Sequence, residues 1–269
     1  MKAGVIVNAS AGNFEYIKEK IIKLKEIFDG IITGPGKFGG DFLNGAEVVE
    51  VISKNFTNAI NELTLKLSKH SDVIVSVGGD GTANFIASAL IDGKSDIPIM
   101  GIAGGTANVG PLVRFSLESL EEPLHVDSVN CLKIWKENQH LGYAFIDVVV
   151  GDTFLGKLNG KMVNLSAKDF LESGRKIEKK PGSDIVENLV VLKNKKKIPI
   201  NIKKASQIIA SPLNFSGFYV GKAVTGSLSW ASFFDSIGIL SISNRVIINS
   251  YLEEHDVEES VVVEQILFR

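Results

Sequence analysis

Residues 72–84 of this 269-residue chain read DVIVSVGGDGTAN, and this stretch decides the fold of the first half. The apolar run Asp72–Val77 is typical of a strand that is buried on both faces of a parallel sheet. It stops at the glycine-rich turn Gly78–Thr82, and the pattern that follows predicts a helix over Ala83–Leu90. Because ligands of such sheets bind beyond the carboxyl ends of strands, this turn is the first candidate site.

Units of the same kind flank this stretch on both sides. Strands are predicted over Val5–Val7, Ile31–Ile32, Val48–Ile52 and Ile97–Ile102, and helices over Thr57–Lys69 and from Thr106 to about Arg114. Alternating strands and helices with short loops indicate an α/β domain with a parallel sheet, of Rossmann or flavodoxin type. Several glycine clusters fall where these strands end, so their loops are expected to meet at one edge of the sheet.

The second half is rich in short strands and turns. Strands are predicted over Val129–Trp135, Gly142–Val150, Ile185–Leu192, Ile198–Ile202, Gln207–Ala210, Gly217–Val220, Ile237–Ile242, Val246–Tyr251 and Ser260–Phe268. This pattern indicates an all-β sandwich. The chain is therefore predicted to form two domains, with an α/β domain at residues 1–120 and a β-sandwich domain at residues 121–269.

Composition excludes several classes of protein. Hydrophobic residues make up 45% of the chain, which is too many for a disordered protein, and the single Cys131 cannot form an internal disulfide. The net charge of −2 gives no broad attraction to nucleic acid, so no nucleic-acid partner is expected. The sequence has no apolar run of the ~18 residues that a transmembrane segment needs. We therefore expect a soluble, cytoplasmic protein.

The turn around Asp80 carries the chemistry. Gly78, Gly79 and Gly81 let the backbone approach a ligand closely, and N–H groups ahead of a helix suit a phosphate. Thr82 is placed to cap the helix or to donate to a phosphate oxygen. A carboxylate in such a loop repels phosphate unless it has a task, such as binding a metal or taking a proton from an attacking hydroxyl. The alternative is a structural turn with a capping aspartate.

Two more loops supply candidate walls of the same site. The strand ending at Ile102 leads into Gly104, Gly105, Thr106 and Asn108, whose polar groups can bind a sugar or a phosphate. Asn8 follows the first strand and adds a third polar position. A plain glycine-rich turn is the alternative for the 104–108 segment. The phosphate-binding loop that ends in Gly-Lys-Ser/Thr and the Gly-x-Ser-x-Gly motif of serine hydrolases are both missing from the sequence.

Residues 78–82, GGDGT, resemble the hallmark of a superfamily that contains NAD kinases, diacylglycerol kinases, sphingosine kinases and bacterial lipid kinases. Residues 5–12, VIVNASAG, and 31–40, IITGPGKFGG, are similar to the archaeal-type branch of ATP-NAD kinases and its acetoin-catabolism relatives. Residues 105–108, GTAN, look more like lipid kinases. The resemblance implies an NAD kinase-like fold, with the site between an α/β domain and a β-sandwich.

The resemblance also implies a reaction, which is phosphoryl transfer from ATP, with Mg²⁺, to a hydroxyl of a small molecule. For NAD kinases this acceptor is the ribose 2′-hydroxyl of NAD, and the product is NADP. Asp80 matches the presumed base, and the glycines and Thr82 match phosphate-binding positions. Asn84 follows the motif as an asparagine does in lipid kinases, and it is expected to bind a phosphate or a nucleotide. Asp147 matches an acidic nucleoside-binding position, where Ile146 replaces the usual asparagine. The metal ligands are not assigned, and a homodimer or homotetramer is expected.

Two alternatives stay open at this point. The first keeps the reaction and replaces the acceptor with a lipid alcohol, as in diacylglycerol or sphingosine kinases. It draws on Thr106 and Asn108 and on four aromatic residues that can equally be core residues, which are Phe38, Phe42, Phe85 and Phe115. The second is a non-catalytic nucleotide-binding homologue that kept the phosphate loop and lost contacts to the nucleoside, and it draws on Ile146.

Overall fold

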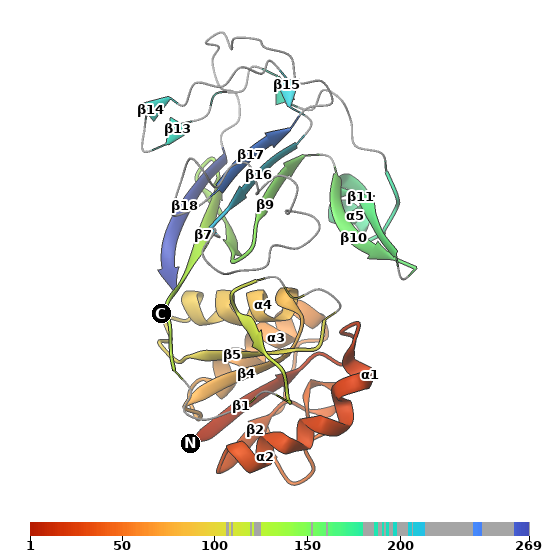
Figure 1. Cartoon of the computed structure of the whole chain (residues 1–269), viewed down its shortest axis with the longest axis vertical. Coiled ribbons are helices and arrows are strands. Elements are labelled where there is room, and N and C mark those ends of the chain that lie inside the picture. Colours follow the sequence, from red (N-terminus) through yellow and green to blue (C-terminus); the bar gives the residue numbers. More distant parts are fainter. Residues whose placement is uncertain are drawn as a thin grey trace.

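A computed structural model gives the three-dimensional structure of the chain. The described residues are 1–105, 108, 110–118, 120, 125–151, 153–159, 161–179, 186–187, 190, 192–193, 196–197, 204–205, 207–212, 239–243 and 261–268. Figure 1 shows a helix-covered sheet formed by the first part of the chain and antiparallel strands formed by the later part.

The first part is built on a six-stranded sheet with the order β3-β2-β1-β4-β5-β6. Its strands are β1 (Lys2–Val7), β2 (Gly30–Thr33), β3 (Glu47–Val48), β4 (Val73–Gly78), β5 (Ile99–Ala103) and β6 (Val113–Phe115). Every neighbouring pair runs parallel, so the carboxyl ends of all six strands lie at the same edge. The predicted parallel α/β architecture is confirmed.

Helices cover both faces of this sheet (Figure 1). One face packs against α1 (Phe14–Ile17), the 3-10 helix η1 (Lys18–Lys23) and α2 (Leu24–Ile27). The other face packs against α3 (Phe56–Leu67) and α4 (Asp80–Asp92). Alternate residues of β4 point to opposite faces, so Val75 belongs to one core and Ile74 to the other. This two-sided burial explains the continuous apolar run of the strand.

Three predicted elements of the first part were wrong in type or length. The strand expected over Val48–Ile52 is reduced to β3, whose two residues are exposed. The helix after the GGDGT turn begins at Asp80, three residues before the expected Ala83, so most of the turn belongs to its first helical turn. The segment expected to be helical up to Arg114 ends in strand β6, which pairs with β5 and extends the sheet.

The later strands are antiparallel and form several small sheets. Their bounds are β7 (Val129–Lys136), β8 (Gln139–Ala144), β9 (Val148–Gly151), β10 (Thr153–Leu158), β11 (Lys161–Ser166), β12 (Val186–Glu187), β13 (Leu192–Lys193), β14 (Lys196–Lys197), β15 (Lys204–Ala205), β16 (Gln207–Ser211), β17 (Ile239–Ser243) and β18 (Val261–Phe268). The sheets have the orders β18-β7-β8 and β17-β16-β9, with the two-stranded pairs β10-β11, β12-β15 and β13-β14.

Sequence patterns predicted these antiparallel strands unevenly. The strand expected over Gly142–Val150 is divided between β8 and β9, which belong to different sheets. The hairpin β10–β11 and the helix α5 (Ala167–Ser173) were not predicted. The strands expected over 198–202, 217–220 and 246–251 lie outside the described residues. Within the described part of the chain, no helix is both long enough and apolar enough to span a lipid bilayer.

The antiparallel part is joined to the first sheet domain through α4. Cys131 of β7 and Phe145, which follows β8, are buried in the same apolar cluster as Ile86 and Leu90 of α4. The hydroxyl of Tyr143 donates to Asp92 at the end of that helix, with an O···O distance of 3.1 Å. The helix that begins at Asp80 is therefore also the surface on which the second part of the chain packs.

Candidate active site

Three loops meet at the carboxyl edge of the parallel sheet, after β1, β4 and β5. The backbone N–H of Asn8 donates to Val77 O at 2.9 Å, and the N–H of Gly104 donates to Gly78 O at 2.7 Å. The side-chain amide of Asn13 donates to Gly105 O at 2.8 Å, which ties the first loop to the third. The predicted meeting of the loops is confirmed.

Glycines allow two of these loops to pack directly on each other. A Cβ atom added to Gly105 would lie 2.9 Å from Gly79 Cα and 2.6 Å from Asn108 Oδ1. Such distances are shorter than real Cβ contacts, so a side chain at residue 105 would push the third loop away from the second. Close approach of backbone to backbone is thus one physical reason for glycine at residue 105.

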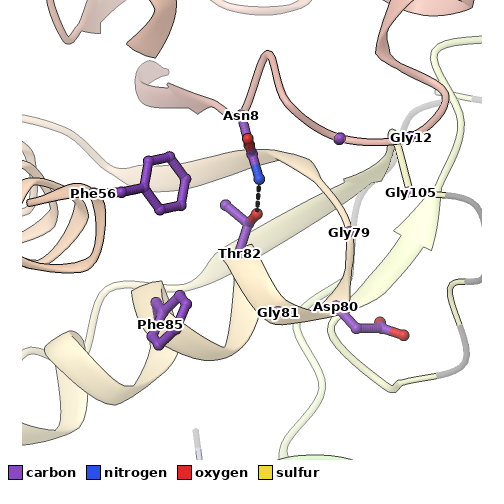
Figure 2. Close-up of a pocket in the computed structure, with 10 residues that line it drawn as sticks. Asn8, Gly12, Phe56, Gly79, Asp80, Gly81, Thr82, Phe85 and Gly105 are labelled. Atoms are coloured by element: carbon purple, nitrogen blue, oxygen red, sulfur yellow. Dashed lines mark hydrogen bonds between the residues drawn. The ribbon is translucent and has the colours of Figure 1, made fainter. Parts of the chain in front are cut away.

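A pocket of about 350 Å³ opens at this junction. Its lining consists of Asn8, Ala11, Gly12, Phe56, Gly79, Asp80, Gly81, Thr82, Phe85 and Gly105. Figure 2 shows the carboxyl group of Asp80 pointing away from the rings of Phe56 and Phe85, so acidic and aromatic groups lie at different ends. Between them, a Cβ atom added to Gly81 would meet nothing within 4 Å, so the helix start borders open space.

Thr82 does not cap α4, contrary to one of the two roles expected for it. The N-cap of α4 is Gly79, and no side chain caps the helix there. The hydroxyl of Thr82, which is 4% exposed, instead accepts a hydrogen bond of 2.8 Å from the side-chain amide of Asn8 (Figure 2). The Oδ1 atom of Asn8 accepts from the N–H of Ser10. Asn8 and Thr82 therefore fix the first loop to the helix start from inside the pocket.

Asp80 is the first residue of α4 and its carboxylate is held from outside the helix. The backbone N–H of Gly110 donates to both carboxylate oxygens, with N···O distances of 3.2 Å each. These bonds fix the direction in which the carboxylate points relative to the helix. The arrangement can present an oriented, negatively charged oxygen to a group bound in the pocket.

Asn84 lies one turn further along α4 and contacts the second part of the chain. Its Nδ2 donates to Tyr143 O at 3.1 Å, and its Oδ1 accepts from Phe145 N at 3.2 Å. One amide thus satisfies two backbone groups and holds the segment that continues into Asp147. Asn84 does not line the pocket. Its side chain instead connects α4 to the second part of the chain.

Asp147 is a partly buried carboxyl group in the same segment. Burial raises the pKa of Asp147 to about 6. Its neighbour Ile146 lies close to Gly110, because a Cβ atom added to Gly110 would be 2.9 Å from Ile146 Cγ1. The second-part segment therefore approaches Asp80 through Gly110, although Asp147 itself does not line the pocket.

The remaining predicted site residues have mixed placements. Gly78 and Gly104 form the hydrogen-bonded connection between the ends of β4 and β5. Asn108 donates from Nδ2 to Gly105 O at 3.3 Å, and its buried Oδ1 has no hydrogen-bond partner among the described residues. Thr106 lies outside the described residues.

Sequence reasoning missed several residues of the site. Ala11 and Gly12 were not among them, because the segment from Asn8 to Gly12 was expected as a third wall, and both residues line the pocket. Phe56 and Gly110 were missed, because their places depend on how α3 and the segment after β5 pack. No cluster of three or more histidine, cysteine or acidic side chains suited to a metal occurs among residues that the structure describes.

Comparisons with known proteins match part of this chain to the model of a catalytic domain. Residues 40–123 match the family model of the diacylglycerol kinase catalytic domain, and this segment contains Asp80 and most of the pocket. An uncharacterized protein of Archaeoglobus fulgidus is 27% identical over 266 residues, which cover 94% of this chain and 80% of that protein.

Two solved structures are also similar at low identity. A putative diacylglycerol kinase from Bacillus anthracis is 13% identical with a TM-score of 0.46, over 98% of this chain and 94% of that one. An NAD kinase from Archaeoglobus fulgidus in complex with ATP is 16% identical with a TM-score of 0.35, over 99% of this chain and 81% of that one. By its sequence, the segment that builds the pocket is thus similar to the catalytic domain of diacylglycerol kinases.

Proposed function

We propose that this chain is an ATP-dependent kinase that transfers a phosphoryl group to a hydroxyl of a small molecule, and that Asp80 is its general base. The observation that carries the proposal is the placement of the Asp80 carboxylate. It stands at the start of α4, at one end of the pocket, and the N–H of Gly110 holds both of its oxygens. A fixed carboxylate beside a phosphate site is what deprotonation of an attacking hydroxyl requires.

The start of α4 supplies the phosphate end of the site. The first N–H groups of a helix have no intrahelical acceptor, and the helix dipole adds partial positive charge there. Gly79, Gly81 and Gly105 keep side chains away from this part of the pocket. Phosphate groups of ATP are therefore proposed to bind over these glycines, where backbone N–H groups can donate to them.

The aromatic end of the pocket suits a nucleobase. Phe56 and Phe85 line it and are 42% and 36% exposed, so their rings remain available to a ligand. Phe56 also stacks on Phe38 at a centroid distance of 5.9 Å, which orders its ring. Stacking of a base on an aromatic ring is independent of base identity, so this contact would support binding of a nucleotide rather than select one base.

Among the described residues, Asp80 is the one carboxylate that lines the pocket, and the proposal assigns it to the acceptor hydroxyl. Mg²⁺ keeps several waters and binds substrate phosphates, so the phosphates of ATP would supply most of its ligands in the site. When bound there, the ion would neutralise charge on the phosphates. Orientation of the acceptor hydroxyl and acceptance of its proton would be carried out by Asp80.

The first candidate acceptor is the ribose 2′-hydroxyl of NAD. The similarity of residues 5–12 and 31–40 to archaeal-type ATP-NAD kinases supports it. The second candidate is a lipid alcohol of the diacylglycerol type. The match of residues 40–123 to the diacylglycerol kinase catalytic domain supports this acceptor.

A phosphoryl-transfer assay with both acceptors tests the proposal. The purified protein is incubated with ATP, Mg²⁺ and either NAD or diacylglycerol in mixed micelles, and phosphorylated product is measured. We expect the Asp80→Asn variant to lose about 10²-fold or more in kcat while nucleotide affinity is retained. Asp96→Asn, an exposed carboxylate outside the pocket, is the matched control and should keep full activity.

Each outcome of this assay has a definite meaning. Product from NAD alone selects the first acceptor, and product from diacylglycerol alone selects the second. Nucleotide binding without transfer to either acceptor contradicts the kinase proposal and favours the non-catalytic nucleotide-binding alternative. Equal turnover by native protein and Asp80→Asn would remove Asp80 from the role of base.

A further inference from the structure

Gly110 occupies the narrow space between Asp80 and the second part of the chain. Its N–H donates to both carboxylate oxygens of Asp80. On the same residue, a Cβ atom would lie 2.9 Å from Asp80 Oδ1, 2.9 Å from Ile146 Cγ1 and 3.0 Å from Ile146 Cδ1. The side chains of Asp80 and Ile146 therefore both border Gly110, and in their present positions they leave no room for a methyl group there.

The need for glycine here is steric rather than conformational. The φ angle of Gly110 lies outside the left-handed range in which other residues are strained, so alanine can adopt this backbone. What alanine cannot do is fit between the two neighbouring side chains without displacing at least one of them. Either the Asp80 carboxylate rotates out of its hydrogen bonds, or the Ile146 side chain, whose Cγ1 and Cδ1 make the contact, changes rotamer or moves with its segment.

The Ile146 segment is itself firmly attached to α4. The side chain of Asn84 binds the backbone of Tyr143 and Phe145, and Phe145 is only 1% exposed in the core beside α4. Asp80 and Asn84 belong to the same helix, so both ends of this contact are fixed to one rigid element. The backbone around Ile146 is thus held in place, and strain introduced at Gly110 is relieved at the side chains of Asp80 and Ile146.

We propose that Gly110 is a positioning residue of the kinase site: its N–H orients the Asp80 carboxylate, and its missing side chain lets Ile146 support that arrangement from the other side. The inference rests on the proposed function for its catalytic consequence. It adds that the second part of the chain contributes to catalysis by bracing the residue that orients the base.

The variant Gly110→Ala tests the inference directly. We expect kcat to fall by about 10²-fold, because displacement of a catalytic group by about 1 Å has an effect of that size. KM for ATP should change by less than about threefold, because the glycines and the two phenylalanines that are proposed to bind ATP lie away from residue 110. Gly30→Ala is the matched control, since its Cβ would meet only the flexible side chain of Lys2, at 3.4 Å, and it should keep wild-type kcat.

A rescue experiment separates positioning from general destabilisation. In the Gly110→Ala background, Ile146→Ala removes Cγ1 and Cδ1, so residue 110 can move away from Asp80 and kcat should recover by about tenfold. Ile146→Val keeps Cγ1 and should rescue far less. Recovery of the urea midpoint without recovery of kcat would overturn the positioning role, as would an unchanged kcat in Gly110→Ala.

The same variants distinguish this inference from the proposed function. A urea-denaturation cycle of Gly110→Ala, Ile146→Ala and the double variant measures their coupling without any enzymatic reaction. Coupling together with a wild-type protein that transfers no phosphoryl group would refute the kinase proposal while confirming the packing at Gly110. Additive effects in the cycle would refute the inference whatever the activity.

Discussion

Replacing Asp147 with asparagine should stabilise the protein at neutral and alkaline pH. Burial raises the pKa of this carboxyl group from the ordinary value of 3.8 to about 6. Above that pH, the native state must hold a charge that the unfolded chain places in water at lower cost. Asparagine has nearly the same shape and carries no charge, so the Asp147→Asn variant removes this penalty.

The size and sign follow from linkage between proton binding and folding. A difference of about two pH units at about 1.4 kcal/mol each gives an upper bound of about 3 kcal/mol, and partial exposure of Asp147 reduces the expectation to about 2 kcal/mol. Because the folded pKa is raised, the wild-type group favours folding most below pH 3.8, and this contribution is lost as pH rises through about 6. The advantage of Asp147→Asn should therefore grow between pH 4 and pH 8.

Urea denaturation of both proteins, monitored by circular dichroism from pH 4 to pH 8, measures this difference. Asp96→Asn, at an exposed carboxylate after α4, is the control for the chemical change itself. An advantage of Asp147→Asn that is flat, or that grows toward acid pH, would refute the assignment of a buried, destabilised charge at residue 147.

Three further outcomes follow from contacts outside the reacting groups. Asn84→Ala should lower the free energy of unfolding by about 1–3 kcal/mol, because two buried backbone groups lose their partner; urea titration checks this. Bonds from Lys66, above all, and from the backbone of residues 52–53 lower the pKa of Glu62 to about 2. The stability gap between wild type and Glu62→Gln should therefore be full above pH 4.5 and close as pH falls toward 2, as pH-dependent melting would show. Burial raises the pKa of Cys131 to about 12, so the native thiol should resist Ellman's reagent until urea unfolds the chain.

The sequence was most informative where local pattern and tertiary structure agree. The apolar run of β4 is buried on both faces, so its strand type and its place within the sheet followed from residue type alone. Asn8, Gly79, Asp80, Gly81, Thr82 and Gly105 were selected because they follow strands, and all six line the pocket. Their common location has a simple geometric cause, since the carboxyl ends of parallel strands share one edge.

Residues far from strand ends were harder to interpret. Asn84 was expected to bind a phosphate or a nucleotide, yet its amide binds Tyr143 and Phe145, 59 and 61 residues further along the chain. In the sequence, nothing distinguishes Gly110 from other glycines. Its proposed role depends on Asp80 and Ile146, which come from different parts of the fold. Long-range packing of this kind leaves no period or spacing in the local sequence.

The shared core beside α4 has a consequence for how the molecule is made. Cys131 and Phe145 are 0% and 1% exposed, and they complete the apolar layer that covers one face of the first sheet. During synthesis the ribosome finishes that sheet well before it adds these two side chains. Until Phe145 has been synthesised, part of the apolar surface of α4 remains uncovered. Asn84 also lacks the backbone groups of Tyr143 and Phe145 to which its side chain binds in the folded protein. In the nascent protein, α4 thus forms early, and the residues that cover it are added only later.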